Sequence, residues 1–346
     1  MTVNELKARL KSGELASFYI IAGEEEYLKK HYRNEIKKAI CPDENDPFAF
    51  FNHVSFDGED FDIGAFSEAV KAPPMMSELK LIEWRFADLG KLKEREISAL
   101  CDLASMREAH PYAVAVITTL PDGFDTGTPK RPSKLYARLS ECFDIISFEK
   151  STDSQLQSWI SRHFAAEGLR VDPRTVGAML ERVGHSMHAL ACEIEKLACY
   201  AKSHGIDTVT VSEVTDICSS TIECDAFAIS NAIIEKNTEK AFLALSDMKQ
   251  QRIEPGAAIA QLARTYADLT SIAYLTEEGL GAADIASIMK FHPYKLGLYM
   301  TAAKKLGAKK IAASLASLVK TDAESKAGGI SGYEAVEIFI AKNIGR

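Results

Sequence analysis

The sequence predicts an α/β domain followed by an all-α region. In the first ~150 residues, short apolar runs alternate with amphipathic segments of helical spacing, which is typical of a mostly parallel sheet covered by helices. After Ser151 the strand signals almost vanish, and helical periodicity continues to the end of the chain. At 346 residues the chain is long enough for two or three domains of ordinary size.

The elements expected in the α/β region follow one another along the chain. Strands are predicted over residues 18–21, 50–56, 79–84, 113–120 and 143–148. Helices are predicted over residues 26–40, 63–70 and 94–106, the last because Ile97, Leu100 and Leu103 have helical spacing. Residues 123–132 are rich in glycine and proline and indicate a turn-rich connection.

Two boundaries are expected in the rest of the chain. Thr152, Asp153 and Ser154 form a typical N-cap cluster at the start of the helical region. Small polar residues at Ser219 and Ser220 indicate a second domain boundary. The sequence therefore predicts an α/β domain over 1–150, a small helical domain over 151–219 and a larger helical domain over 220–346.

Composition favours a soluble globular protein. No apolar run approaches the ~20 residues that a membrane span requires, and the N-terminus lacks an apolar signal core, so we expect no membrane association and a cytoplasmic location. The seven cysteines are scattered without a C-x₂-C pair, which predicts mostly reduced core residues and no zinc site.

Charge is unevenly distributed along the chain. The net charge is −8, but from residue 290 onward there are ten basic and four acidic residues, a local charge of +6. The lysine pairs 304–305 and 309–310 suit contacts with phosphate, although a solvated helix face is the ordinary alternative. The candidate DNA-proximal residues are Lys295, Lys304, Lys305, Lys309, Lys310 and Lys326.

Residues 23–30 lie in the register of a phosphate-binding loop, G-x-x-x-x-G-K-[ST]. Gly23 and Lys29 match it, but Leu28 replaces the second glycine and Lys30 replaces the hydroxyl residue that holds Mg²⁺. Three consecutive glutamates in the loop would also repel a polyphosphate. The alternative is an ordinary strand-glycine-helix connection whose glutamates stabilise the helix N-terminus, and this fragment alone favours that alternative.

The sequence predicts no catalytic centre, metal site or cofactor. The later strand offers only Glu83, followed by Trp84 and Arg85, where an ATPase needs acidic residues for Mg²⁺. The histidines are dispersed, and neither a nucleophile elbow nor a cysteine-protease signature is found.

Residues 73–76, two prolines followed by two methionines, indicate a binding element. Pro73 and Pro74 stop the preceding helix, so Met75 and Met76 are presented on a rigid turn or at the start of a short helix. Methionine adapts well to apolar pockets, so an exposed pair is a natural anchor on a partner. The alternative is that both side chains close the core.

Residues 285–299 are similar to a helix-turn-helix. Such a unit can enter a major groove, but small helical domains contain the same geometry without touching DNA, and we favour the structural interpretation.

Taken in order, these pieces resemble the delta subunit of the bacterial DNA polymerase III clamp loader over essentially the whole chain. The segments that carry the resemblance are 20–28, 73–76 with 80–82, 193–197, 225–229, 285–294, and Asp322 with Lys326. The resemblance implies an AAA+-like N-terminal domain, a small helical lid domain and a C-terminal helical collar domain.

In that family, delta binds and opens the ring-shaped sliding clamp (beta) for loading onto primer-template DNA, while neighbouring subunits hydrolyse ATP. The resemblance implies that the collar joins the gamma/tau and delta prime subunits. It places the clamp-binding pair at Met75 and Met76, where relatives commonly carry Leu-Phe. It also explains Glu141 in the place of an ATPase arginine, and Met187 and His188 where a sensor arginine is expected.

We therefore expect a non-catalytic clamp-loader subunit that belongs to the DNA polymerase III holoenzyme. Two alternatives remain from the residues themselves: an active AAA+ ATPase with an atypical loop, and a helix-turn-helix DNA-binding protein.

Overall fold

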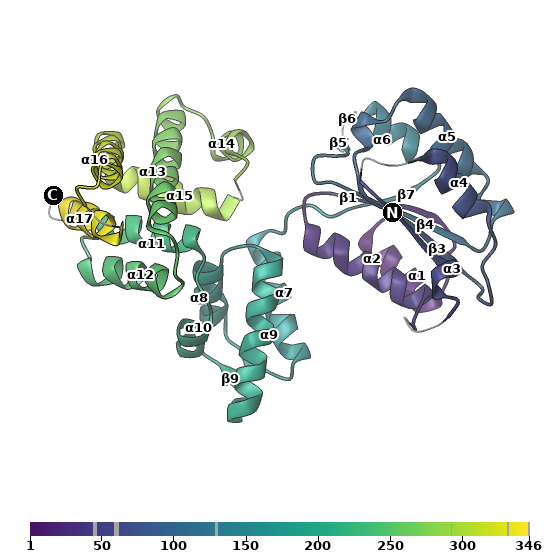
Figure 1. Cartoon of the computed structure of the whole chain (residues 1–346), viewed down its shortest axis with the longest axis horizontal. Coiled ribbons are helices and arrows are strands. Elements are labelled where there is room, and N and C mark those ends of the chain that lie inside the picture. The colour runs from purple at the N-terminus through teal and green to yellow at the C-terminus, as the bar shows by residue number, and fades with distance from the viewer. Residues whose placement is uncertain (44–46, 59–61, 129–130, 292, 331, 345–346) are drawn as a thin grey trace. The chain divides into compact units, whose positions relative to one another are not determined.

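The chain forms two compact units, Met1–Ser151 and Thr152–Arg346 (Figure 1). The structure, a computed structural model, describes residues 1–346 except 44–46, 59–61, 129–130, 292, 331 and 345–346. The predicted boundary near residue 150 lies beside the division between the units, and the predicted boundary at 219–220 lies inside the second unit and stays a prediction.

A five-stranded parallel sheet with the order β2-β3-β4-β1-β7 forms the centre of the first unit. Its strands are β1 (Phe18–Ala22), β2 (His53–Asp57), β3 (Lys80–Ala87), β4 (Ala113–Thr119) and β7 (Asp144–Ser147). Every residue of β1 and β4 is buried, because helices cover both faces of a parallel sheet. Continuous apolar runs therefore predicted these central strands well.

Helices lie on both faces of this sheet (Figure 1). They are α1 (Val3–Ser12), α2 (Glu26–Ile40), α3 (Ala49–Asn52), α4 (Ile63–Lys71), α5 (Glu94–Ser105) and α6 (Lys134–Leu139), with 3-10 turns η1 (Leu89–Lys91) and η2 (Arg107–Ala109). Phe18 and Ile20 of β1 pack in a core with α4 and α5, whereas Tyr19 and Ile21 pack with α1 and α2. The helices predicted over 26–40, 63–70 and 94–106 are confirmed as α2, α4 and α5.

One strand prediction in this unit is wrong in part. Residues 50–52 belong to the short helix α3, and the strand begins only at His53, because the side chains of Phe50 and Phe51 point into solvent and do not join the sheet. The connection 123–132 contains a small antiparallel ladder of β5 (Gly127–Thr128) and β6 (Arg131–Pro132). Positions 129 and 130 of that connection lie outside the described residues.

The second unit begins with four helices and a small strand pair. The helices are α7 (Asp153–Ala166), α8 (Pro173–Val183), α9 (Met187–His204) and α10 (Val211–Ile217), and the strands are β8 (Arg170–Val171) and β9 (Thr208–Val209). Thr152 caps α7 as predicted, since its hydroxyl accepts a hydrogen bond from the Gln155 N–H. The parallel β8–β9 pair was not predicted, because two residues are too few to show strand periodicity.

Further helices follow in the described part of this unit. They are α11 (Ile222–Ile234), α12 (Thr238–Gln250), α13 (Pro255–Glu277), α14 (Ala282–Met289), α15 (Pro293–Leu306), α16 (Ala308–Lys326) and α17 (Gly332–Ile344). Tyr266 of α13 is fully buried and meets Phe339 of α17 edge to face, with ring centroids 5.6 Å apart. The helical character predicted for this region is confirmed.

In the described part of the chain, no single helix is both long and apolar enough to cross a membrane, although α10 and α11, bent by 116°, pass that test as a pair. The seven cysteines all lie within the described residues, and none of them forms a disulfide bond. The prediction that most of them are core residues holds in part: Cys218 is buried, and Cys41, Cys101 and Cys142 are half-buried and pack against the cores of the first unit. Cys192 and Cys199 are exposed on α9.

Candidate functional site

The β1–α2 loop, which has the register of a phosphate-binding loop, is closed against the end of β7. Gly23 has a φ of 101°, and a Cβ at this position would lie 2.3 Å from the carbonyl oxygen of Phe148. The Glu25 N–H donates to that same oxygen over 2.9 Å. A phosphate-binding loop points its N–H groups at the ligand, so one donor is already occupied by the protein's own chain.

Lys29 has the position of the phosphate-binding lysine, but its side chain is fully buried. Its Nζ donates to the Thr119 carbonyl over 2.8 Å and forms an ion pair with Glu26 over 2.6 Å. A buried ammonium needs such partners, because losing its hydration without compensation is costly. These internal contacts occupy the charge that a nucleotide phosphate would otherwise use. Leu28 is half-buried, and Lys30 is exposed.

Acidic groups surround the same loop. Burial raises the pKa of the Glu25 carboxyl above its ordinary value. Glu24 forms an ion pair with Lys150 over 3.1 Å. A carboxylate that is charged repels a polyphosphate, which carries charge of the same sign.

Glu83, the acidic residue on β3, is also engaged internally. It is 2% exposed, and its carboxylate lies 2.5 Å from Nε2 of His53 and 3.6 Å from Nε of Arg33. Among the described residues, no group of three or more histidine, cysteine or acidic side chains is placed to hold a metal ion.

Met75 and Met76 lie on a bend after α4, on the surface of the first unit. Their exposed fractions are 43% and 86%. Pro73 and Pro74 precede them, the first exposed and the second half-buried. The interpretation of the two methionines as core residues is therefore wrong.

Sequence reasoning missed three residues beside this bend. The side-chain amide of Asn52 accepts from the Met75 N–H and donates to the Met75 carbonyl, both over 2.7 Å. Phe50 and Phe51, the neighbours of Asn52 in α3, are 82% and 48% exposed. The apolar run around them predicted a strand, and no local signal in the sequence linked Asn52 to a position 23 residues later.

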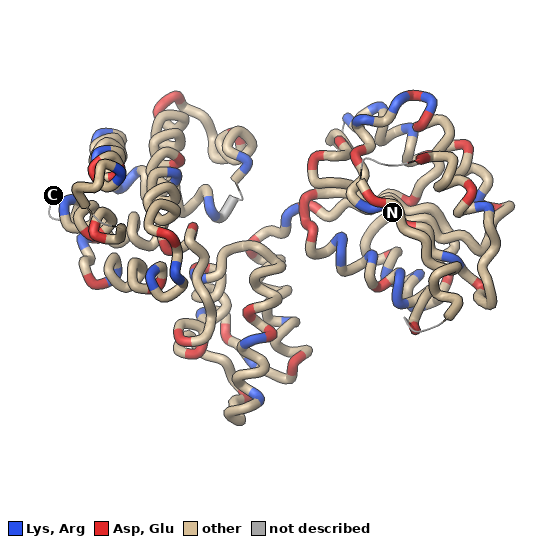
Figure 2. Tube along the Cα trace, in the orientation of Figure 1, with Lys and Arg blue, Asp and Glu red and all other residues tan. Residues whose placement is uncertain are grey.

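Four of the six candidate DNA-proximal lysines gather where α15 meets α16. Lys304 and Lys305 lie in the last turn of α15, and Lys309 and Lys310 lie in the first turn of α16; all four are exposed. Figure 2 shows where basic residues lie along these helices. The remaining two have acidic partners, since Lys295 pairs with Glu223 and Lys326 with Asp322, each over 2.6 Å.

The segment predicted to resemble a helix-turn-helix contributes its apolar residues to the core. Ile285, Leu296 and Tyr299 are buried, and Phe227 of α11 stacks on Tyr299 with ring centroids 4.5 Å apart. His292, in the turn, lies outside the described residues. The geometry accords with a structural unit.

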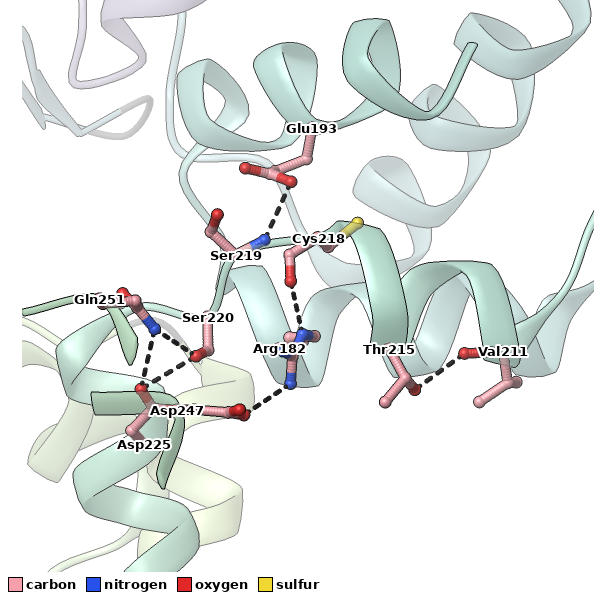
Figure 3. A network of polar contacts seen from close by, with 10 residues as sticks. All are labelled: Arg182, Glu193, Val211, Thr215, Cys218, Ser219, Ser220, Asp225, Asp247 and Gln251. Atoms are coloured by element: carbon pink, nitrogen blue, oxygen red, sulfur yellow. Dashed lines mark hydrogen bonds and ion pairs between the residues drawn. The ribbon is translucent and has the colours of Figure 1, made fainter. Parts of the chain in front are cut away.

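A polar network joins α8 to the helices that follow it within the second unit (Figure 3). Arg182 donates to the Cys218 carbonyl over 2.7 Å and to Asp247 over 3.0 Å. Beside it, the Ser220 hydroxyl and the Gln251 amide both donate to Asp225. Burial raises the pKa of Asp225 to about 6, although these hydrogen bonds act to lower it.

Two regions of the chain match known family descriptions. Residues 19–143 match "DNA polymerase III, delta subunit", and residues 223–343 match "DNA polymerase III delta subunit, C-terminal domain". The chain belongs to the DNA polymerase III delta subunit family. The family resemblance seen in the sequence is thereby confirmed.

Similar proteins agree with this membership. The Bacillus subtilis (strain 168) DNA polymerase III subunit delta is 22% identical over 347 residues, covering 97% of this chain and 95% of that protein. The solved structure titled "Bacillus subtilis DNA clamp loader delta protein (YqeN)" has a TM-score of 0.77 at 21% identity, covering 99% of this chain and 100% of that one. The Thermotoga maritima RuvB Holliday junction branch migration motor is much less similar, with a TM-score of 0.39 at 11% identity, covering 86% of this chain and 82% of that one.

The predicted fold class, an AAA+-like α/β unit followed by helical regions, is confirmed. Delta-family membership also gives a context to the positions where ATPase arginines were expected. Glu141 is exposed after α6, Met187 is buried at the start of α9, and His188 is exposed next to it. None of these three side chains carries a guanidinium that could reach a neighbour's phosphate.

Proposed function

We propose that this chain is the clamp-opening subunit of a DNA polymerase III clamp loader and that it performs no ATP hydrolysis itself. The observation that carries the proposal is the exposed pair Met75–Met76 on a bend fixed by neighbouring hydrogen bonds, in a chain of the delta family. The pair would insert into an apolar pocket of the sliding clamp. The collar helices would join the other loader subunits, and we expect the complex in the cytoplasm.

Differential binding is sufficient for ring opening without ATP hydrolysis in this subunit. A protein that binds an open or strained ring interface better than the closed one shifts the ring towards opening by the difference in binding free energy. A preference of a few kcal/mol changes the ratio of the two states by roughly 10²- to 10³-fold. ATP-driven steps in neighbouring subunits would then control when the methionine pair is presented.

Clamp affinity of the full chain tests the role of the methionines. We expect Met75→Ala with Met76→Ala to weaken binding of the organism's own sliding clamp by about 10- to 100-fold, or about 1.4 to 2.8 kcal/mol, because buried apolar anchors dominate interface energy. Met106→Ala is the matched control, since this methionine of the same unit is 42% exposed. Unchanged affinity in the double variant would exclude this pair as the anchor.

Nucleotide binding by the isolated chain separates the proposal from an active ATPase. The buried contacts of Lys29 and the acidic loop support weak or absent binding. Saturable ATP binding in equilibrium dialysis, at physiological ATP concentration, would favour the alternative of an ATPase with an atypical loop.

We propose that the α15–α16 corner contacts primer-template DNA through Lys304, Lys305, Lys309 and Lys310. Lys309→Gln with Lys310→Gln should weaken DNA binding by the assembled loader and reduce the salt slope by about 1 to 2, with little dependence on sequence. Lys236→Gln with Lys240→Gln removes the same charge near α12 and is the control. Sequence-dependent affinity would instead favour the helix-turn-helix alternative.

A further inference from the structure

Two exposed hydrophobic pairs, distant in the sequence, are brought together in the first unit. Phe50 and Phe51 lie in α3, and Met75 and Met76 lie on the bend after α4. Phe50 is 82% and Met76 86% exposed. The two phenylalanine rings meet each other edge to face, with centroids 5.6 Å apart. Solvent-exposed large apolar side chains that cluster in this way mark interaction surfaces.

Asn52 connects the two pairs. Its side chain is held in a site that leaves only 3% of the residue exposed. There it forms two 2.7 Å hydrogen bonds with the backbone of Met75, one to the N–H and one to the carbonyl. One amide side chain thus satisfies both the backbone N–H and the backbone carbonyl of one residue. The methionine bend is therefore fixed to α3 through Asn52.

The backbone of the bend needs this fixation. Met76 has a φ of 55°, in the left-handed region that residues other than glycine and asparagine seldom adopt. Surrounding contacts must stabilise such a conformation for it to persist. Asn52 supplies the contacts immediately before it, which presents the Met76 side chain in a defined direction.

We infer that the clamp-binding surface has two parts, Met75–Met76 and Phe50–Phe51, and that Asn52 is the positioning residue that holds them together. This inference rests on the proposed function. The occupant is the same sliding clamp, because α3 is joined directly to the methionine bend and a partner that takes Met76 must also approach the rings beside it. Chemically, the clamp should offer an apolar pocket with a flat apolar area next to it.

The test compares clamp affinity for the full-length variants. Phe50→Ser with Phe51→Ser should weaken clamp binding by about 10-fold or more. Phe86→Ser, at a residue of the same unit that is 53% exposed, should change it by less than about 2-fold. Equal effects of the two changes would overturn the bipartite surface. The bipartite surface would also be overturned if the phenylalanine variant lost self-association, measured by light scattering, and kept its clamp affinity.

Asn52 has its own readout. Asn52→Ala should accelerate hydrogen exchange of the Met75 amide by about 10-fold or more and weaken clamp binding, while the far-UV spectrum is retained. Asn52→Asp keeps the acceptor for the Met75 N–H and loses the donor to the carbonyl, so its clamp affinity should be intermediate. Faster exchange with unchanged clamp affinity would overturn the positioning role.

The methionine double variant shows whether the proposed function fails or only the inference of a two-part surface. If Met75→Ala with Met76→Ala weakens clamp binding and the phenylalanine variant does not, only the inference is overturned. If the methionine variant itself binds normally, the proposed function fails and the inference fails with it.

Discussion

Lys29 illustrates how one residue can keep its place in a motif and change its role. The sequence shows a lysine in the phosphate-binding register, but it cannot show that the side chain turns inward to the end of β4. There its ammonium donates to the Thr119 carbonyl and forms an ion pair with the Glu26 carboxylate. Removing one partner from such a buried set of contacts leaves a polar group without compensation, which destabilises the fold.

Substitution of Lys29 should therefore reduce stability and spare clamp binding. We expect Lys29→Met, which retains most of the volume, to lower the free energy of unfolding by about 1 to 2 kcal/mol through the unpaired Thr119 carbonyl. Lys29→Ala, which also leaves a cavity, should lower it by about 2 to 4 kcal/mol. Urea denaturation measures both, with the exposed Lys30→Met as a control that should stay within about 0.5 kcal/mol. A Lys29→Met variant as stable as the wild type would show that the buried contacts are energetically neutral.

At the level of elements, the reliability of sequence prediction followed burial. β1 and β4 are apolar along almost their whole length because both faces are covered, and α2, α4 and α5 bury one regular stripe, so periodicity identified all of them. α3 is different, because its phenylalanines face solvent and its apolar composition therefore predicts a strand that does not form. Sequence prediction assumes that apolar residues are buried, and exposed apolar residues are an exception to this. Here the exception lies in the inferred binding surface.

The α15–α16 corner shows a second local conflict of this kind. Lys304 and Lys305 stabilise the C-terminal end of α15 through its dipole, whereas Lys309 and Lys310 stand at the N-terminal end of α16, where positive charge is unfavourable. The cost is a few tenths of a kcal/mol to about 1 kcal/mol per charge. An unfavourable placement of two exposed lysines supports the proposed contact with phosphate.

On the scale of the whole molecule, the chain consists of two units with separate cores, and each contains one of its two tryptophans. Trp84 lies in β3 of the first unit, and Trp159 lies in α7 of the second. The change of pattern after Ser151 predicted a boundary there, whereas the tertiary contacts that connect each unit internally have no signal in the sequence. Arg182 and Asp247, 65 residues apart in the chain, meet in Figure 3, and only the folded structure relates them.

Asp225 should add a pH dependence to the stability of the second unit and none to that of the first. Its folded-state pKa of about 6 lies above the ordinary value of 3.8 because of burial, with Asp247 adding to the rise and Ser220, Arg182 and Gln251 opposing it. Because the folded-state pKa is raised, the contribution of Asp225 to the stability of the fold is fully present below pH 3.8. This contribution is lost as the pH rises through about 6. Asp225→Asn carries no charge at any pH, so the wild type should lose about 1 to 2 kcal/mol relative to this variant between about pH 4 and 7, after allowance for partial screening.

The two tryptophans locate that effect. In a Trp84→Phe background, fluorescence follows Trp159 and the second unit, and the difference in midpoint caused by Asp225→Asn should grow with pH. In a Trp159→Phe background, fluorescence follows Trp84, and the denaturation midpoints should be the same with and without Asp225→Asn at every pH. Midpoints are the quantity to compare, because the ring centroid of His163 lies 4.1 Å from that of Trp159, so the fluorescence intensity also depends on this neighbouring ring. If Asp225→Asn shifted the midpoint equally at both tryptophans, the two units would unfold as one cooperative body. If the shift in midpoint at Trp159 did not depend on pH, Asp225 would stay charged on folding.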